Sequence, residues 1–176
     1  MKIPLSGKGK IEPLKQNFSY CTYDNKIFIS GKKGFIIDVL DYTGKPLFTI
    51  SQNCKPQEFT PDDEKRIRKL YKLFYGQRYE ALKHLLVFPD YYPEIREFIA
   101  ADNRLYVVTY QKKNNNFACF IFDLEGKLLN KLFIPIAYDL SLWDYPFDIQ
   151  KGKLYQLIEN ENEEWELHVT MIYEKK

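Results

Sequence analysis

The segment DNRLYVVTYQKKNNNFACFIFDLEGKLL, residues 102–129, decides the fold that this sequence predicts. It contains two apolar runs separated by a polar tract, and the second run ends in the turn sequence DLEG at residues 123–126. The segment DNKIFISGKKGFIIDVLDYTGKPLF, residues 24–48, has the same order of features. The chain is therefore organised by a repeat, and we expect each copy to form neighbouring antiparallel strands.

Two blocks of this repeat align residue by residue. Residues 24–29 (DNKIFI) match residues 102–107 (DNRLYV), and residues 39–47 (VLDYTGKPL) match residues 121–129 (IFDLEGKLL). A third, weaker copy begins with KGKLY at residues 151–155 and lacks the closing turn. Each copy predicts an antiparallel meander of roughly 40–50 residues, the length of a propeller blade, and such sheets must stack to bury their faces.

The repeat resembles the six-bladed β-propellers of the NHL and TolB-like kind over most of the chain. The resemblance is carried by the FDLEGKLL and LDYTGKPL turns, the IPI sequence at residues 134–136, the DNRLYV strand, and FPDYYPEI at residues 88–95, which is similar to a blade-entry strand. It implies an all-β fold of antiparallel, propeller-like blades, a partial six-bladed type with one helical insertion. It transfers no catalytic residue, because such propellers share an architecture and not one chemistry. The expected single domain spans residues 1–176, with blades at about 18–56, 92–136 and 145–174.

Residues 60–87 interrupt the β pattern and predict the helical insertion. Thr60 is a favourable N-cap, and Pro61 fits the first helical position. The apolar side chains that follow recur with helical spacing at Ile67, Leu70, Tyr71 and Phe74. We expect one helix, or two with a break near Gly76, forming a flap that packs its apolar stripe on a sheet. A lid or a partner-docking element is the alternative.

The composition argues against several classes of partner. Aromatic residues make up 16% of the 176 residues, which favours β-structure. A net charge of +2 is too balanced to predict nucleic-acid binding. No apolar run approaches the ~20 residues of a membrane span, and residues 1–10 lack the apolar centre of a signal peptide. The chain reads as soluble, but relatives of the resembled family are often exported, so its compartment stays open.

Motifs for catalysis or metal binding do not occur in the sequence. Its three cysteines, Cys21, Cys54 and Cys119, form no C-x-x-C pair, and His84 and His168 have no ligand at metal-site spacing. We expect Cys21 and Cys119 to be buried in strands and both histidines to lie on the surface. The sequence predicts no catalytic, cofactor-binding or metal-binding residue, and no cofactor.

Aromatic side chains are the candidate ligand-binding residues. Tyr91 and Tyr92 precede the second copy of the repeat, and Trp143 and Tyr145 precede the third. Aromatic residues in such connections either line a pocket or pack against the sheet. The sequence therefore predicts a non-catalytic binding or scaffold protein of β-propeller type, with a protein or small-molecule ligand. The alternative is a lactonase-like or lyase-like propeller enzyme that uses a central metal.

Three blades would leave open sheet faces that need cover. Residues 2–5 (KIPL) resemble residues 133–136 (FIPI), so the chain begins like the tail of a preceding blade. This is expected for part of a propeller or for a short version of one. A homodimer of two three-blade halves would complete a six-bladed ring.

Overall fold

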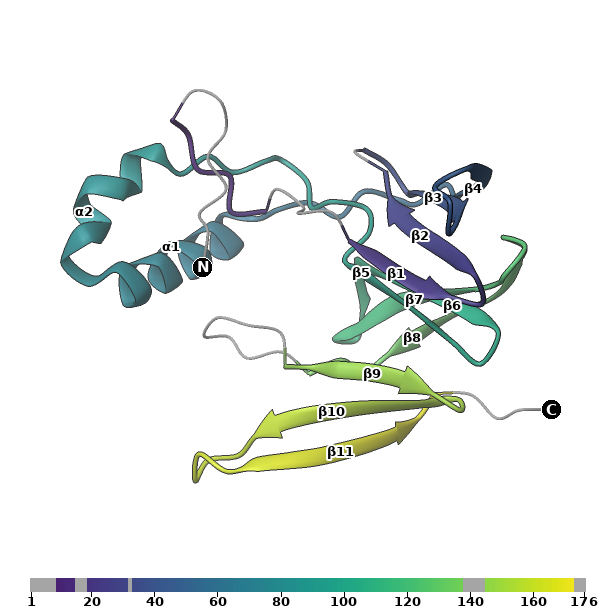
Figure 1. The fold of residues 1–176 in the computed structure, drawn as a ribbon. Helices are drawn as coiled ribbons and strands as arrows, with labels where there is room; N and C mark the ends of the chain where they lie inside the picture. The colour runs from purple at the N-terminus through teal and green to yellow at the C-terminus, as the bar shows by residue number, and fades with distance from the viewer. Residues whose placement is uncertain (1–8, 15–18, 32, 138–144, 173–176) are drawn as a thin grey trace.

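The computed structural model describes residues 9–14, 19–31, 33–137 and 145–172. Three antiparallel sheets follow one another along this part of the chain, and a helical insertion separates the first sheet from the second (Figure 1). The all-β class with one helical insertion is thus confirmed, while the propeller assignment stays a prediction. The predicted blade tail at residues 2–5 lies outside the described residues, as does Trp143.

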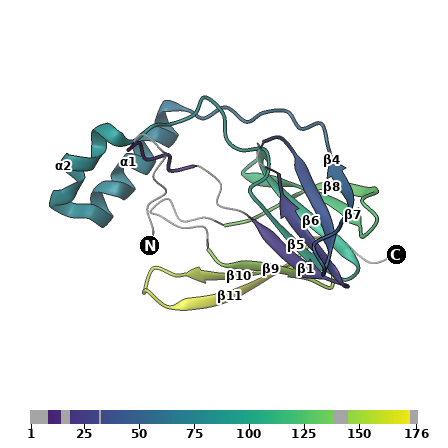
Figure 2. The same cartoon turned by 45° about the horizontal axis from the view of Figure 1, so that its top comes forward.

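Each sheet is a meander in which consecutive strands pair. The first has the order β1-β2-β3-β4, the second the order β5-β6-β7-β8, and the third the order β9-β10-β11. The strands are β1 Tyr20–Tyr23, β2 Lys26–Ser30, β3 Ile36–Asp41, β4 Pro46–Ser51, β5 Glu97–Ala101, β6 Arg104–Lys113, β7 Asn116–Asp123, β8 Leu128–Ile134, β9 Phe147–Gln150, β10 Lys153–Glu159 and β11 Trp165–Met171. The first strands of the sheets adjoin, since β1 contacts β5 and β5 contacts β9 (Figures 1 and 2).

The repeated turn sequences form equivalent turns. Asp24 and Asn25 have φ values of 47° and 59°, and Asp102 and Asn103 have 54° and 57°. Asp and Asn tolerate this left-handed region, and two such residues in succession make the tight hairpin whose twist matches the paired strands. The closing turns agree as well, because the carboxylates of Asp41 and Asp123 each accept the backbone amides two and four residues later.

The second sheet lies between the other two and is buried on both faces. Residues at equivalent positions of the repeat lie on the same face of their respective sheets. Phe28 and Tyr106 lie on one face, which we call the front, and Leu105 and Leu154 lie on the other, the back. One core packs the front of the first sheet on the back of the second, and another packs the front of the second on the back of the third. The sheets therefore stack front to back.

The helical insertion folds on itself and not on a sheet. It consists of α1 Pro61–Tyr75, η1 Gly76–Arg78, α2 Tyr79–Leu82 and η2 Lys83–Leu85, so the predicted break at Gly76 is confirmed. The predicted packing is wrong. Ile11 is fully buried in a separate cluster with Tyr79 and Leu86, and its backbone exchanges two 2.8 Å hydrogen bonds with the segment after α2. Among the described residues, this N-terminal segment packs on Tyr71 of the apolar stripe, whereas Phe74 of the stripe is 47% exposed.

Candidate functional site

The helical insertion is attached through a paired stem. Residues 57–59 enter α1 and residues 90–92 leave the insertion, and the two segments run antiparallel. The amide of Phe59 donates to the carbonyl of Asp90, and the amide of Tyr92 donates to the carbonyl of Gln57, both over 2.9 Å. The ring of Phe59 contacts that of Tyr92 with their centroids 5.1 Å apart. The stem fixes Tyr92 next to the start of α1.

Two contacts fasten this stem to the far end of β6. The rings of Tyr92 and Tyr110 stack with centroids 4.5 Å apart and planes 17° from parallel. The side-chain amide of Gln111 donates to the carbonyl of Lys55 over 2.6 Å. The stacked pair joins the stem to a central strand of the second sheet. The helical insertion is therefore fixed against this sheet at the stem.

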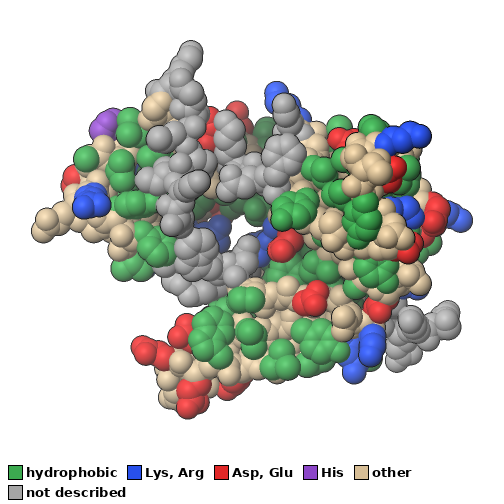
Figure 3. Space-filling view, in the orientation of Figure 1, with side chains coloured by type: hydrophobic (Ala, Val, Ile, Leu, Met, Phe, Trp, Pro, Cys, Tyr) green, Lys and Arg blue, Asp and Glu red, His purple; other side chains and the backbone are tan. Residues whose placement is uncertain are grey.

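A cavity of about 220 Å³ opens at this boundary. Figure 3 shows a hollow between the insertion and the sheets, with Lys and Arg side chains at its edge. Its lining comes from four separate segments of the chain. The lining residues are Gln57, Asp63, Arg66, Tyr92, Arg96, Tyr110, Lys112 and Phe117.

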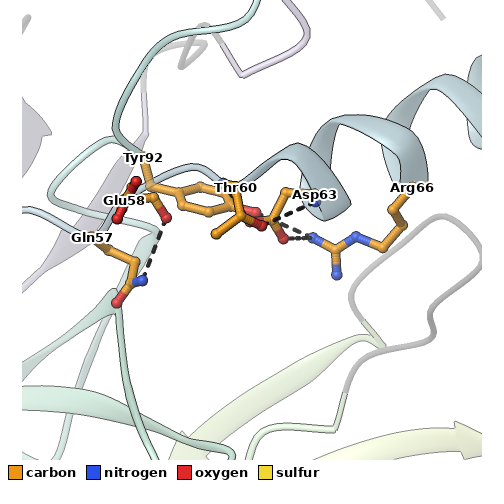
Figure 4. A network of polar contacts seen from close by, with 6 residues as sticks. All are labelled: Gln57, Glu58, Thr60, Asp63, Arg66 and Tyr92. Atoms are coloured by element: carbon orange, nitrogen blue, oxygen red, sulfur yellow. Dashed lines mark hydrogen bonds and ion pairs between the residues drawn. The ribbon is translucent and has the colours of Figure 1, made fainter.

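Helix α1 contributes Asp63 and Arg66 to the lining of the cavity, and Figure 4 shows both side chains beside Tyr92. Thr60 and Asp63 make a capping box, in which each side chain accepts the backbone amide of the other. Asp63 also pairs with Arg66 at 3.2 Å. The guanidinium of Arg66 in turn donates to the hydroxyl oxygen of Tyr92 over 3.2 Å. Helix capping therefore positions a charged pair against the stem.

The part of the lining that comes from the second sheet carries two cations over a single aromatic ring. The guanidinium carbon of Arg96 lies 4.1 Å from the ring centroid of Phe117, and the ammonium nitrogen of Lys112 lies 4.6 Å from it. Arg96 is buried and Lys112 is exposed. Cation–π contacts hold both side chains in place. Arg66 and the carboxylate of Asp63 line the same cavity.

The acidic groups of this site have shifted pKa values. Partial burial opposes ionisation of Asp63, but hydrogen bonds from Thr60 and Tyr92 and the charge of Arg66 outweigh it and lower its pKa. Burial raises the pKa of the Tyr92 phenol, and the neighbouring Asp63 carboxylate raises it further. At neutral pH, Asp63 is thus ionised and Tyr92 keeps its proton.

Replacing Asp63 with asparagine is expected to lower the free energy of unfolding at pH 7 by about 1 kcal/mol, as for loss of a helix cap. Since the pKa of Asp63 is lower in the folded state than the ordinary pKa of an aspartate, about 3.9, ionised Asp63 stabilises the fold above that ordinary value. This contribution disappears as the pH falls through the folded-state pKa. Urea denaturation at pH 7 and at pH 3 should therefore show a smaller difference between the two proteins at pH 3.

The neighbouring Asp62 supplies the control, because its side chain is 89% exposed and pairs with Lys65 on the surface. Replacing Asp62 with asparagine should change stability by less than about 0.5 kcal/mol at either pH. Equal effects at positions 62 and 63, or an Asp63 effect that grows toward pH 3, would contradict the assigned role.

The candidates named from sequence lie in different places. Tyr92 lines the cavity, but Tyr91, beside it in the chain, is 55% exposed and is not part of the lining. Tyr145 packs edge-on against Trp165 of the third sheet, 6.2 Å away. None of the three cations that line the cavity was named as a candidate from the sequence. The signal that pointed here was the aromatic pair at residues 91–92.

Other predictions about reactive side chains can be compared with the structure. Both histidines are exposed, as predicted, and Cys119 is buried, whereas Cys21 is only half-buried. Burial raises the pKa of the Cys119 thiol to about 12. Among the described residues, no three His, Cys, Asp or Glu side chains gather where they could hold a metal ion. None of the described helices has the length and apolar character needed to cross a membrane.

The chemistry of this cavity follows from its lining. Arg and Lys donate charge-assisted hydrogen bonds to oxyanions, and three such side chains line the cavity. The cavity is therefore suited to a small, negatively charged group. No protein-family model matches the chain, and no curated protein matches it in sequence.

Proposed function

We propose that this chain is a non-catalytic binding protein of propeller type whose pocket, between the helical insertion and the second sheet, takes a small oxyanion. One observation carries the proposal. Arg96 and Lys112 lie within 5 Å of the same Phe117 ring centroid, and Arg66 lines the same cavity. The ligand would be a phosphate or a carboxylate, either free or as the end group of a larger molecule.

The charges of the lining favour an anion. Like charges that are held close together repel one another, and partial burial strengthens this repulsion because the surroundings screen it less than water does. Asp63 offsets part of the charge through its pair with Arg66. Arg96 and Lys112 both lie over Phe117 in the same lining. A bound oxyanion would accept charge-assisted hydrogen bonds from the Arg and Lys side chains of the lining.

The size and the aromatic contacts narrow the class of ligand. A cavity of about 220 Å³ is smaller than the roughly 300–1,000 Å³ of pockets that enclose drug-sized molecules. Tyr92 and Tyr110 stack on each other, and Phe117 is covered by cations. Recognition by charge therefore has more support here than stacking of a ligand ring. The metal-dependent hydrolase stays a prediction that the contacts of this pocket do not test.

Calorimetric titration of the full chain with inorganic phosphate, and separately with succinate, tests the proposal. At low salt we expect saturable binding of at least one of the two, weakening as salt is added. Replacing Lys112 with glutamine should weaken binding about tenfold, since one charge-assisted hydrogen bond is worth roughly 1.5–3 kcal/mol. The two probes separate a phosphate site from a carboxylate site.

Lys113 provides a matched control because it follows Lys112 in β6, is exposed, and does not line the cavity. Its replacement with glutamine changes the net charge by the same amount and should leave the affinity within about twofold. If neither anion binds, or if the two variants lose affinity equally, the pocket is not an oxyanion site.

A further inference from the structure

The third sheet has an open apolar face. Its back packs on the second sheet, but its front carries alternate residues of β11 that are half-exposed or more. The exposed fractions are 57% for Trp165, 62% for Leu167, 50% for Val169 and 56% for Met171. Leu157 lies opposite Leu167 in the adjoining strand and is 43% exposed. Hydrophobic side chains accordingly gather over this sheet in the space-filling view (Figure 3).

At the other end of the stack, the back of the first sheet is open and combines apolar side chains with the exposed Asp38, which lies opposite Ile29 and accepts a hydrogen bond from Thr49. Its front contributes Phe28 and Val39 to the core that it shares with the second sheet. The side chains that alternate with these form the back: Tyr20 is 71% exposed and Ile36 is 37% exposed. Ile29, opposite Tyr20 in the next strand, is half-buried. The described sheets thus end in an open front and an open back.

We propose that two copies of this chain associate head to tail, with the front of each third sheet packed on the back of the partner's first sheet. The chain already makes this type of contact twice, because both of its cores join a front to the next back. A second copy supplies one surface of each kind, and so covers both open faces at once. Burying large apolar side chains on both faces drives the association.

Charges at the turns are complementary in this arrangement. Within the chain, neighbouring β-hairpin turns are joined: Tyr23 bonds to Asn103 at one boundary, and the Lys151 amide donates to Asp102 at the next. Continuing this order brings Lys151 beside the partner's Asp24. At the other end of the sheets, the acidic turn at residues 160–164 would adjoin Lys33 of the partner copy. Opposite charges at both turns favour this partner and this direction.

The proposed assembly is closed. Two head-to-tail contacts related by a twofold axis leave neither open face exposed, whereas the same contact without closure would give a filament. Two copies of three sheets make six, which is within the usual range of about four to eight propeller blades. The pocket is not part of either interface, so the association is independent of the proposed oxyanion binding.

Sedimentation equilibrium of the full chain tests the ring. We expect a species of twice the 21.1 kDa chain mass. Leu167→Glu on the front and Tyr20→Glu on the back should each weaken the dimer at least about 100-fold, because each buries an unpaired charge. Since both positions are more than 60% exposed, both variants should keep the wild-type circular dichroism spectrum.

Mixing the two variants gives the sharpest outcome. A mixed dimer contains one undamaged interface, between the front of the Tyr20→Glu chain and the back of the Leu167→Glu chain, so the mixture should dimerise more tightly than either variant alone. Leu73→Glu, on an exposed helix position, is the control and should dimerise like wild type. The proposal is overturned by a monomer at all concentrations, by an open polymer, or by a dimer that Tyr20→Glu leaves intact.

Discussion

Replacing Phe122 with alanine is expected to lower the free energy of unfolding by about 3–5 kcal/mol. Phe122 lies on β7, is 1% exposed, and belongs to the core between the first and second sheets. Its ring lies 5.9 Å from that of Phe35, which belongs to the first sheet's side of this core. The substitution removes a large side chain from a site that neighbouring strands hold open. Urea denaturation followed by circular dichroism measures the loss.

Phe133 on β8 is the matched control, since it is the same residue type in the same sheet and is 37% exposed. Its replacement with alanine should cost less than about 1 kcal/mol. If the two sheets fold as one unit, Phe122→Ala should shift a single transition without changing its slope. A loss at Phe122 no larger than that at Phe133 would mean that this core does not hold the sheets together.

The strands were predictable because their signals are local. Short runs of apolar and aromatic side chains at residues 27–29 and 105–108 indicate the strands, and the Asp-Asn pairs before them favour the left-handed turn. The first repeated block, residues 24–29, contains the turn before β2 and most of that strand, Lys26–Ser30. Comparison of the two copies of the repeat also located the insertion, because the residues that match neither copy lie between two complete meanders.

The packing of the insertion was not predictable in the same way. Its apolar stripe required a buried partner, but the periodicity of a helix does not say which segment provides it. The sequence suggested a sheet, and the structure has Ile11, which is about 50 residues before the helix in the chain. A single isoleucine in a short polar segment carries no periodic signal that could reveal this role.

The sequence predicted only part of the candidate site, for a related reason. Tyr92 was predicted as a ligand-binding residue because aromatic and proline residues cluster around it. Arg96 and Lys112 lie in or beside ordinary strand sequences, and their common property is the Phe117 ring that they share in space. Contacts between segments decide which charges face one another, and those contacts depend on where the stem joins β6.

Replacing Tyr92 with alanine should detach the insertion from the second sheet. Tyr92 stacks on Tyr110, packs against Phe59, and accepts a hydrogen bond from Arg66. Loss of a partly buried aromatic side chain with these contacts should cost roughly 2–4 kcal/mol. Because the helical cluster around Ile11 contains none of these groups, we expect the loss to appear as local opening of the stem.

Hydrogen exchange measured by mass spectrometry distinguishes local from global loss. In Tyr92→Ala, exchange should rise at least about tenfold in the stem and the first turn of α1, while β7 keeps its protection. Phosphate or succinate affinity should fall by at least about tenfold, since Arg66 and Arg96 no longer share a fixed cavity. Measuring hydrogen exchange and anion affinity on the same variant tests whether the contact between the stem and β6 keeps the cavity in shape.

Tyr92→Phe separates the ring from its hydroxyl. The phenylalanine ring can keep the stacking on Tyr110, so exchange in the stem should remain within about threefold of wild type. The contact with Arg66 is lost, and the anion affinity should fall only moderately. If Tyr92→Phe opens the stem as much as Tyr92→Ala does, the contacts of the Tyr92 hydroxyl with Arg66 and Asp63 attach the insertion to the sheet. The stacked rings would then contribute little to this attachment. If neither variant changes exchange, the stem is held by its backbone ladder, and the cavity would keep its shape without Tyr92.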